Sequence, residues 1–413
     1  MASQATLRRI GIVNQAAAGW AAATSYTRML LFSLGDACRE TDVELCFLSS
    51  PENSNQAPGR LKAQTVNLNP LEYFPGERGV RSLLRLPAKT GSFRGEARLR
   101  HLLRLPDKSD LFFAARENGI DVLLPLFDVP PWDTGLKVIG WIPDFQHVHL
   151  PEYFTEADRA RRDKSMRRLS ERATLLMLSS RAAEAHFTAF APAQAHKARV
   201  VSFPSLFAFE PPAGDALAAR DKFNVPEKFA LVANQFWAHK NHALVIAALG
   251  LLKKKGLHIP LVMTGLLSDY RDPSNQNLSR LLQSIAAAGL SGQVTILGQV
   301  PYADLVDLMR AAALVIQPSR FEGWSTIVQD AIALGRPLLC SDIAVHLEQA
   351  PNALGFFPCD DAASLAALLA EHWPGLKPGP DLEAEAAALQ QEREFARRHG
   401  QTLLAICREA CLA

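Results

Sequence analysis

The chain has 413 residues, which exceeds the roughly 250–300 residues at which one hydrophobic core usually divides, so two domains are expected. Apolar residues make up 48% and charged residues 21% of a globular composition, and the net charge of +2 gives no reason to expect nucleic-acid binding. The six cysteines form no CxxC pair and fit neither a zinc site nor a disulfide framework, which favours the cytoplasm. The N-terminus lacks the apolar core of a signal peptide, and no apolar run approaches the ~18 residues of a membrane span.

Short apolar runs alternate with helix-length segments along the chain. Those of the first half lie at 9–14, 43–49, 121–126, 137–142, 174–180 and 198–203. Those of the second half lie at 229–234, 259–265, 293–298, 313–319, 336–342 and 354–358. The runs are nearly continuous in apolar character, which is typical of parallel strands covered by helices on both faces. Repeated βαβ units, and hence an α/β fold with doubly wound parallel sheets, are predicted.

A segment rich in Pro and Phe, at 203–215, separates the two series of runs and is expected to be a hinge. We therefore predict an N-terminal Rossmann-like domain over residues 1–205 and a C-terminal Rossmann-like domain over residues 206–394. The remaining segment, about 395–413, is helical in composition and is expected to pack back along the hinge. A plain terminal helix of the second domain is the alternative.

The turn after the run 313–319 is more polar than a connection needs. Its residues are Glu322, Gly323, Trp324, Ser325, Thr326 and Ile327, with Asp330 following. Thr326 and Gln329 fit a capping box, so a helix is expected to begin there. The amides at its start would favour a phosphate, whereas Glu322 and Asp330 suit hydroxyl groups of a sugar or ribose. The turn therefore indicates a nucleotide-sugar site, and a solvated acidic loop with an ordinary cap is the alternative.

Other strand ends of the second half also carry candidate residues, because ligands of doubly wound sheets bind beyond the carboxyl ends of the strands. Lys240 follows the run 229–234 and suits a phosphate, with His239 in the same turn. A metal site is not favoured there, since no acidic ligand is adjacent. Gly298 and Val300 follow the run 293–298, where the backbone could flank a planar base. The loop after 259–265, "LLSDYRDPSN", is expected to be a surface connection.

Two turns of the first half stand out. Asp144, Gln146, His147 and His149 gather after the run 137–142, more than an ordinary loop would hold, so a functional role is favoured. After the first run, Gly19 lies in a loop of small residues that opens a helix and allows close backbone approach to a ligand.

Together these motifs resemble the retaining GT-B glycosyltransferases of family 4, which include many bacterial lipopolysaccharide and capsule enzymes. The resemblance rests on Glu322 and Asp330 with seven residues between them, on "NQFWAHKNH" and on "GRPLLCSDIAVHLEQ", and it is strongest over 229–350. It implies two Rossmann-like domains facing across a cleft. It also implies transfer of a sugar from an NDP-sugar to a saccharide or lipid-linked acceptor, with no cofactor and no metal ion.

The resemblance assigns roles to the residues. Glu322 would meet the donor sugar, Asp330 the ribose and Lys240 the diphosphate. His147 would be the histidine of the first domain near the donor sugar. The other donor-side residues implied are Gln235, His239, Gly298, Val300, Trp324, Ser325, Thr326, Ile327 and Gly19, and the acceptor-side residues are Asp144 and Gln146.

Two departures from the family pattern keep alternatives open. Gln235 stands where many members carry an arginine, and Ala22 and Ala23 stand where many carry paired glycines. A sugar-nucleotide epimerase of the same fold is one alternative, and a nucleotide-sugar-binding protein with weak or no catalysis is the other. A dinucleotide oxidoreductase is not favoured, because no GxGxxG follows a strand.

The segment 78–108 is basic, with nine Arg or Lys residues against two Asp or Glu residues, and leucines lie between the arginines. Such a segment predicts peripheral contact with an anionic membrane surface, at the inner membrane face. A solvated basic loop or helix pair is the alternative.

Overall fold

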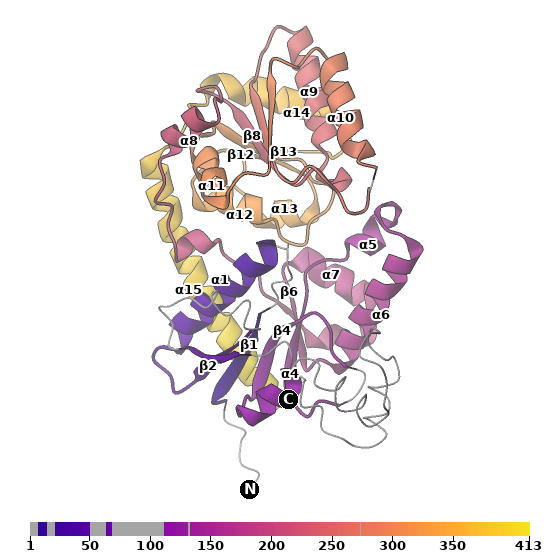
Figure 1. The fold of residues 1–413 in the computed structure, drawn as a ribbon, viewed down its shortest axis with the longest axis vertical. Helices are drawn as coiled ribbons and strands as arrows, with labels where there is room; N and C mark the ends of the chain where they lie inside the picture. The colour runs from indigo at the N-terminus through magenta and orange to yellow at the C-terminus, as the bar shows by residue number, and fades with distance from the viewer. Residues whose placement is uncertain (1–6, 15–20, 50–62, 68–110, 131–132, 273) are drawn as a thin grey trace, which may run out of the picture.

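The computed structural model describes residues 7–14, 21–49, 63–67, 111–130, 133–272 and 274–413. Two lobes are stacked along the long axis of the molecule, and each is built on its own parallel sheet (Figure 1). Gly19 and the basic segment 78–108 lie outside the described residues.

The sheet of the first lobe has seven strands in the order β3-β2-β1-β4-β5-β6-β7. They are β1 (Arg9–Val13), β2 (Glu44–Ser49), β3 (Ala63–Asn67), β4 (Val122–Leu126), β5 (Lys137–Ile142), β6 (Leu175–Leu178) and β7 (Ala198–Val200). The α-helices of this lobe within the described residues are α1 (Ala21–Cys38), α4 (Leu111–Glu117), α5 (Gln146–His149), α6 (Glu156–Arg172) and α7 (Arg181–Phe190).

The sheet of the second lobe has six strands in the order β10-β9-β8-β11-β12-β13. They are β8 (Ala230–Ala233), β9 (Leu261–Thr264), β10 (Val294–Gly298), β11 (Leu314–Gln317), β12 (Leu338–Ser341) and β13 (Gly355–Phe357). The α-helices are α8 (Ala216–Lys222), α9 (His242–Lys254), α10 (Gln276–Ala287), α11 (Tyr302–Ala311), α12 (Thr326–Ala333), α13 (Ala344–Gln349) and α14 (Ala362–His372).

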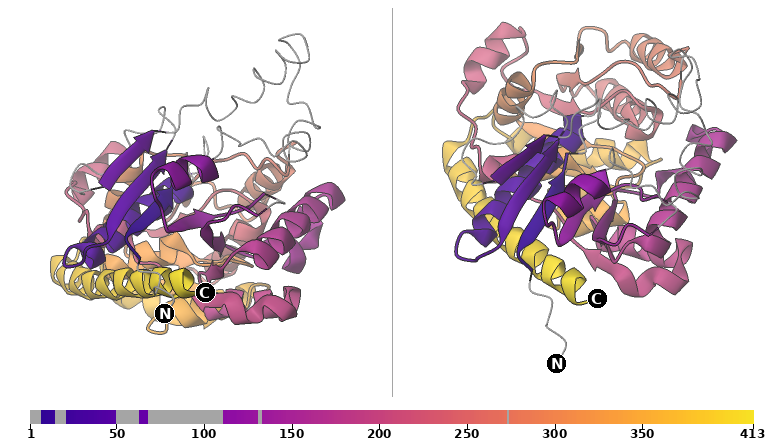
Figure 2. Two further views of the ribbon diagram at one scale, coloured as in Figure 1. Left: turned by 90° about the horizontal axis from the view of Figure 1, so that it is seen from below. Right: turned by 60° about the horizontal axis from the view of Figure 1, so that its bottom comes forward.

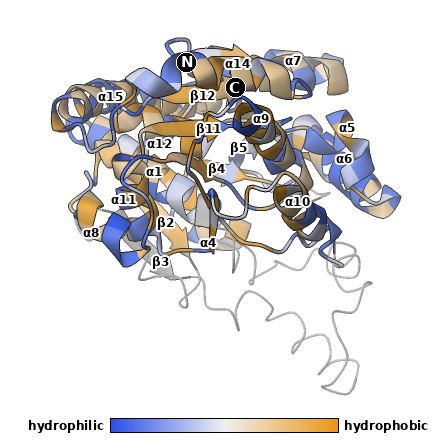
Figure 3. Cartoon of the chain, turned by 90° about the horizontal axis from the view of Figure 1, so that it is seen from above, coloured by the Kyte–Doolittle hydropathy of each residue, from blue (hydrophilic) through white to orange (hydrophobic). Residues whose placement is uncertain are grey.

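The continuous apolar runs are explained by burial. Strands β4, β8, β9, β11 and β12 are buried at every position, since helices cover both faces of each sheet. Figure 3 shows the same contrast, with β11 and β12 hydrophobic and α6 mostly hydrophilic. The predicted α/β class with parallel sheets is confirmed. Strand β3 is missing from the predicted strands, because its sequence AQTVN at the sheet edge is too polar to read as an apolar run.

Both sheets reverse their strand order at an equivalent place, between β1 and β4 in the first and between β8 and β11 in the second. At such a switch point the connections leave the two strands in opposite directions, which opens a space for a ligand at their carboxyl ends. The polar turns after β8 and β11 lie there.

The chain passes from the first lobe to the second through residues 201–215, which include the 3-10 helix η4 (Leu206–Ala208). It returns in α15 (Leu382–Leu412), the yellow helix that runs along one side of both lobes in Figures 1 and 2. Close packing on α1 is possible because Gly400 has no side chain: a Cβ there would lie 2.1 Å from the carbonyl oxygen of Ser33. Leu403 and Cys407 then complete the core of the first lobe. None of the helices in the described residues is long and apolar enough to cross a membrane.

Candidate active site

Lys240 and Glu322 meet at the switch point of the second sheet. Lys240 ends the short 3-10 helix η5 (Ala238–Lys240) after β8, and Glu322 lies in the turn after β11. The ammonium group donates to Glu322 Oε1 across 2.5 Å, and the two side chains are only 14% and 12% exposed. The pair is therefore largely buried, and it places a cation and a carboxylate side by side.

Asn241 fixes the turn that presents Lys240. Its backbone adopts the left-handed conformation, with φ of 58°, which ends η5 and lets α9 begin at His242. Asparagine tolerates this conformation better than most residues. The Asn241 side-chain amide donates to the carbonyl oxygens of Pro318 and Cys359, at 3.1 and 2.8 Å, and so ties the turn after β8 to the turn after β11.

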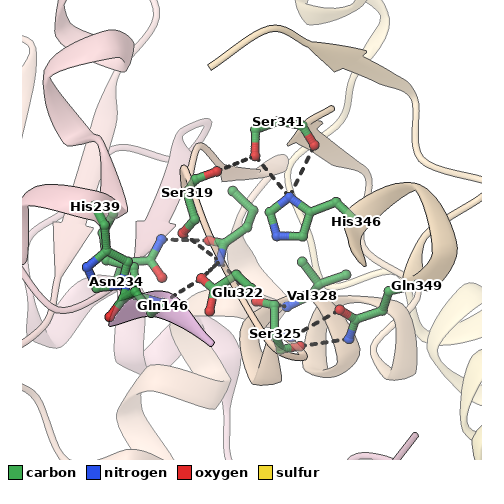
Figure 4. Close-up of polar contacts among 12 residues, drawn as sticks. Gln146, Asn234, His239, Ser319, Glu322, Ser325, Val328, Ser341, His346 and Gln349 are labelled. Atoms are coloured by element: carbon green, nitrogen blue, oxygen red, sulfur yellow. Dashed lines mark hydrogen bonds and ion pairs between the residues drawn. The ribbon is translucent and has the colours of Figure 1, made fainter. Parts of the chain in front are cut away.

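A buried amide network holds Glu322 from the other side (Figure 4). Gln317, the last residue of β11, donates from Nε2 to Glu322 Oε1 at 3.0 Å and to Ser325 Oγ at 2.9 Å. Its Oε1 accepts from Asn234 Nδ2, at the end of β8, at 2.6 Å. The carboxylate is therefore positioned by strand ends rather than by a free loop. Sequence reasoning missed Gln317 and Asn234, although polar residues that end apolar strands were a readable signal.

Ser325 caps helix α12, which corrects the capping box predicted from Thr326 and Gln329. The hydroxyl oxygen of Ser325 accepts from the backbone N–H of Val328, so Thr326 is already the first helical residue. The Gln329 side chain instead donates to Glu392 of α15. Gln349 of α13 completes the start of the helix, since its side chain accepts from the Ser325 amide and donates to the Ser325 carbonyl oxygen.

The backbone amides at the start of α12 differ in whether a side chain already accepts a hydrogen bond from them. Those of Ser325 and Val328 have side-chain acceptors. Thr326 and Ile327 follow the cap, where an α-helix has no backbone acceptor of its own, and they are the amides left for an anion in the described part of the chain. Only part of the predicted set of residues 325–327 is therefore open to a phosphate.

His346 supports the same region from α13. Its Nδ1 lies 3.0 Å from Ser341 Oγ and 3.1 Å from Ser341 O, and burial lowers the pKa of the ring to about 4. The imidazole is neutral at pH 7. Nε2 is buried and has no partner among the described residues. His346 was not among the predicted residues, because a histidine inside a helix gives no signal in the sequence.

The first lobe brings the segment 143–149 against this site. Gln146 and His147 open α5 and are buried. His147 Nε2 lies 2.9 Å from Asp163 of α6, while its Nδ1 is buried without a partner among the described residues. Burial lowers the pKa of His147, against the opposing effect of Asp163. Asp144 lies close to Gly323 of the second lobe, and its Oδ1 accepts from the Gln146 amide at 2.9 Å.

The loop after β9 is not the surface connection predicted from its sequence. Asp269 and Arg271 form a buried ion pair there, with side chains 5% and 8% exposed. Arg271 also donates to Gln146 Oε1 of the first lobe and lies 3.2 Å from His239 Nδ1. The loop is polar because it contributes a charged pair to the contact between the lobes.

The turn after β11 touches the first lobe as well. A Cβ on Gly323 would lie 1.8 Å from the carbonyl oxygen of Pro143, so only glycine fits this contact. The Trp324 side chain is engaged with the first lobe: its indole N–H donates to Phe203 O at 3.0 Å, and its ring packs on the core of that lobe. The predicted donor-side role of Trp324 therefore falls to its backbone.

Asp330 faces the hinge rather than Glu322. It is buried in α12, and its Oδ1 accepts from the hydroxyl of Ser205 at 2.6 Å. Glu392 of α15 accepts from the backbone N–H of the same Ser205 at 2.5 Å. Burial raises the pKa of both carboxyl groups to about 7. The hinge thus rests on two buried acids from different helices.

The remaining predicted residues line the neighbouring strand ends. Gln235 follows β8, and its Oε1 accepts from the amide of Leu266 at 2.6 Å. Gly298 ends β10 with φ of +67°, and its carbonyl oxygen accepts from Thr264 Oγ1 at 2.7 Å. Val300 follows and packs against the core of the second lobe. In the described part of the chain, no cluster of three or more His, Cys, Asp or Glu side chains is placed to hold a metal ion.

The structure therefore brings Lys240 and Glu322 into direct contact, and joins His239 to Gln146 through Arg271. Among the described residues, the ring of His147 is bound to Asp163 rather than to this pair. A site of this composition can hold a polyanion at Lys240 and the start of α12, and hydroxyl groups at Glu322.

Comparison with known proteins matches residues 215–372 to the family described as glycosyl transferases group 1. A search of curated proteins found no match. Among solved structures, the chain is similar to a glycosyltransferase from Rickettsia africae ESF-5, with 12% identity over 98% of both chains and a TM-score of 0.62. It is also similar to HepE from Anabaena in complex with UDP and glucose, with 13% identity over 97% of this chain and 98% of HepE and a TM-score of 0.59. A UDP-forming α,α-trehalose-phosphate synthase from Burkholderia xenovorans matches with 14% identity over 98% of this chain and 99% of the synthase, at a TM-score of 0.58.

The chain thus contains a glycosyl transferases group 1 domain, which spans most of the second lobe. The likeness to the solved structures covers both lobes and confirms the predicted GT-B fold.

Proposed function

From its glycosyl transferases group 1 domain, we propose that the protein is a retaining glycosyltransferase of family 4. It moves a sugar from an NDP-sugar to a saccharide or lipid-linked acceptor, in the synthesis of bacterial surface polysaccharide. The observation that carries the proposal is the Lys240–Glu322 pair, held at the switch point beside the N-terminus of α12. HepE was solved in complex with UDP and glucose, and the trehalose-phosphate synthase is UDP-forming, so UDP-sugars are the first donors to test.

The charges of the site suit the two parts of such a donor. Lys240 and the amides of Thr326 and Ile327 would bind the diphosphate, because a cation and a helix N-terminus both stabilise negative charge. Glu322 would accept hydrogen bonds from sugar hydroxyls. Binding exchanges the Lys240–Glu322 contact for these two sets of bonds, so neither charge is left unpaired when the donor is bound.

Chemistry with retention would depend mainly on the leaving diphosphate. Negative charge develops on it as the glycosidic bond breaks, and groups fixed in place around it stabilise the transition state. Glu322 is held by Lys240 and Gln317, a geometry that suits binding rather than nucleophilic attack. We propose same-face departure and attack, without a covalent glycosyl-enzyme and without a metal ion. Transfer that is unchanged by EDTA, with retained anomeric configuration in the product, is the expected result.

The acceptor would approach from the first lobe, past the segment that holds Asp144, Gln146 and His147. The reaction would take place in the cytoplasm, at the inner face of the membrane if segment 78–108 contacts anionic lipid. We propose that residues 1–205 form the acceptor domain, to which the segment of about 395–413 returns, and that residues 206–394 form the donor domain.

The proposal is tested by incubating the protein with UDP-, GDP- and ADP-sugars and a panel of saccharide and lipid-linked acceptors. Release of NDP together with a glycosylated product supports it. Conversion of the sugar without NDP release would instead identify an epimerase. Binding without any turnover over the whole panel would favour a binding protein, the alternative that Gln235 raises. A Lys240→Ala variant run in parallel shows whether product formation depends on the site described here.

A further inference from the structure

The loop between β9 and α10 folds onto the turn that carries Lys240. The backbone N–H of Phe236 donates to Leu266 O at 2.9 Å, and Gln235 Oε1 accepts from Leu266 N at 2.6 Å. At the far end of the loop, Asn277 Nδ2 donates to Phe236 O at 2.9 Å. These bonds fix the loop at both ends against residues 235–236, five and four positions before Lys240.

The guanidinium group of Arg271, which belongs to this loop, is held in a fixed position by its neighbours. Its Nε and Nη2 donate to the two carboxylate oxygens of Asp269, at 3.0 and 3.1 Å. The guanidinium carbon lies 5.0 Å from the ring centroid of Trp237 and 5.4 Å from that of Phe154, which belongs to the first lobe. A guanidinium held by a bidentate carboxylate and by rings from both lobes loses little further freedom when it binds a ligand.

The other two contacts of Arg271 are long and go to neutral acceptors. Nη1 donates to Gln146 Oε1 and Nη2 lies against His239 Nδ1, both at 3.2 Å. His239 is neutral, since burial lowers its pKa well below the usual value. A guanidinium has five N–H groups, and phosphate oxygens accept more strongly than neutral groups do. An entering phosphate would therefore displace His239 or Gln146 as acceptor, while the pair with Asp269 stays intact.

Gln235 links the turn that holds Lys240 to the loop that holds Arg271. It lies five residues before Lys240 and carries no charge, and its side chain is used to hold the β9–α10 loop. The loop in turn delivers Arg271 to His239, the residue next to Lys240. The loop after β9, the neighbouring strand, thus places a second cation beside the turn that holds Lys240.

We infer that Arg271 is a phosphate-binding residue of the donor site, and that it acts with Lys240 on the diphosphate of the NDP-sugar. The inference rests on the proposed function and adds a residue to it. Because Arg271 bonds to the diphosphate and not to the nucleoside, its contribution should grow with the number of phosphate groups. A residue that only holds the two lobes together would instead affect every nucleotide equally.

Calorimetric titration with UDP, UMP and uridine separates these roles, with the guanosine and adenosine series run in parallel. Arg271→Ala should weaken UDP binding by about 10- to 100-fold, UMP binding less and uridine binding not at all. Equal losses for the three ligands, or no loss for UDP, would overturn the inference. Arg280→Ala is the matched control, since Arg280 lies exposed on α10 and bonds only to Gln276 among the described residues.

Two further variants keep the test decisive. Arg271→Ala leaves Asp269 buried without its cation, so the double variant Asp269→Asn, Arg271→Gln removes the charge without that penalty and should show the same dependence on phosphate number. Gln235→Arg in the Arg271→Ala background should restore part of the UDP affinity, because it returns a cation to the same turn; failure of both variants to behave this way contradicts the inference.

The wild-type titration separates failure of the inference from failure of the proposed function. If the wild-type protein binds no nucleoside diphosphate, the proposed function itself fails together with this inference. Wild-type binding that Arg271→Ala leaves unchanged would contradict the inference alone.

Discussion

The ammonium group of Lys240 lies 2.5 Å from Glu322 Oε1, and this contact joins the turns that follow β8 and β11. The partners come from the two strands between which the sheet reverses its order. Each of them suits a different part of a nucleotide sugar, so the donor would have to separate the pair. The ion pair therefore keeps both groups in place, and compensates their charges, while the site is empty.

Lys240→Ala should lower the rate of sugar transfer by on the order of 10²–10³-fold, because one fixed cation on the leaving diphosphate is lost. The fold should persist, since Gln317 still donates to Glu322. Initial rates of NDP release and thermal unfolding curves measure the two effects. Lys222→Ala is the control, as Lys222 pairs with Asp304 on the surface of the same lobe. Turnover close to wild type in the Lys240 variant would contradict the assignment.

Glu322→Gln should weaken NDP-sugar binding more than binding of the bare NDP, because Glu322 is assigned to sugar hydroxyls. A lost hydrogen bond to a charged group corresponds to about 10- to 100-fold in affinity. Asp330→Asn is the comparison variant: Asp330 is buried and bonded to Ser205 of the hinge rather than to the sugar site, so any effect of its replacement should fall on both ligands alike. Calorimetry with the two ligands gives the comparison, and equal losses in the Glu322 variant would reject this division of roles.

Glu392→Gln should make the protein relatively more stable as the pH rises. Burial raises the pKa of Glu392 from 4.5 to about 7, so the native state holds its proton more tightly than the unfolded state does. Its stabilising contribution is present in full below the unfolded value and is lost as the pH rises towards 7. The difference in unfolding free energy between variant and wild type should therefore shift in favour of the variant from about pH 4.5 to pH 7.

That difference is measured by denaturant unfolding at several pH values, with a limiting slope of about 1.4 kcal/mol per pH unit for one group. Glu394→Gln is the control on the same helix, because Arg397 lowers the pKa of Glu394 and its titration lies below this window. A flat difference for the Glu392 variant between pH 5 and 7 would show that Glu392 is already ionised in the folded protein.

Segment 78–108 should bind the protein to anionic vesicles at low salt and release it at high salt. Basic residues near an anionic surface contribute about 1 kcal/mol each, and salt screens the attraction over a Debye length of ~8–10 Å. Vesicle flotation with and without anionic lipid measures it. Replacement of Arg81, Arg85, Arg98 and Arg100 by glutamine should abolish the binding, and a protein that ignores anionic vesicles at low salt would indicate a soluble or protein-borne acceptor.

Much of the fold could be predicted from the sequence, because buried parallel strands are apolar along their whole length. Strand β3 could not, since an edge strand needs no such run. Lys240 and Glu322 could be found because each lies in the polar turn that follows an apolar run. Their contact, however, arises because β8 and β11 are neighbours in the sheet, and the pattern of apolar runs does not reveal the order of the strands.

The residues that sequence reasoning misjudged depend on partners distant in the chain. Thr326 and Gln329 have the spacing of a capping box, but Gln329 bonds to Glu392 and Ser325 takes over the cap. Arg271 seemed to belong to a surface loop because its partners Gln146 and His239 lie 125 and 32 positions away. Contacts of this kind depend on the tertiary fold, which the local sequence does not show.

The turns after β8 and β11 are proposed to form a nucleoside-diphosphate site built around Lys240. Calorimetric titration of the wild-type protein with UDP, GDP and ADP, and of Lys240→Ala with whichever of them binds most tightly, tests it most directly. At least one of the three should bind the wild-type protein, and its affinity should fall by about tenfold or more in the variant. Absence of binding by all three, or equal affinity in the wild-type protein and the variant, would contradict it.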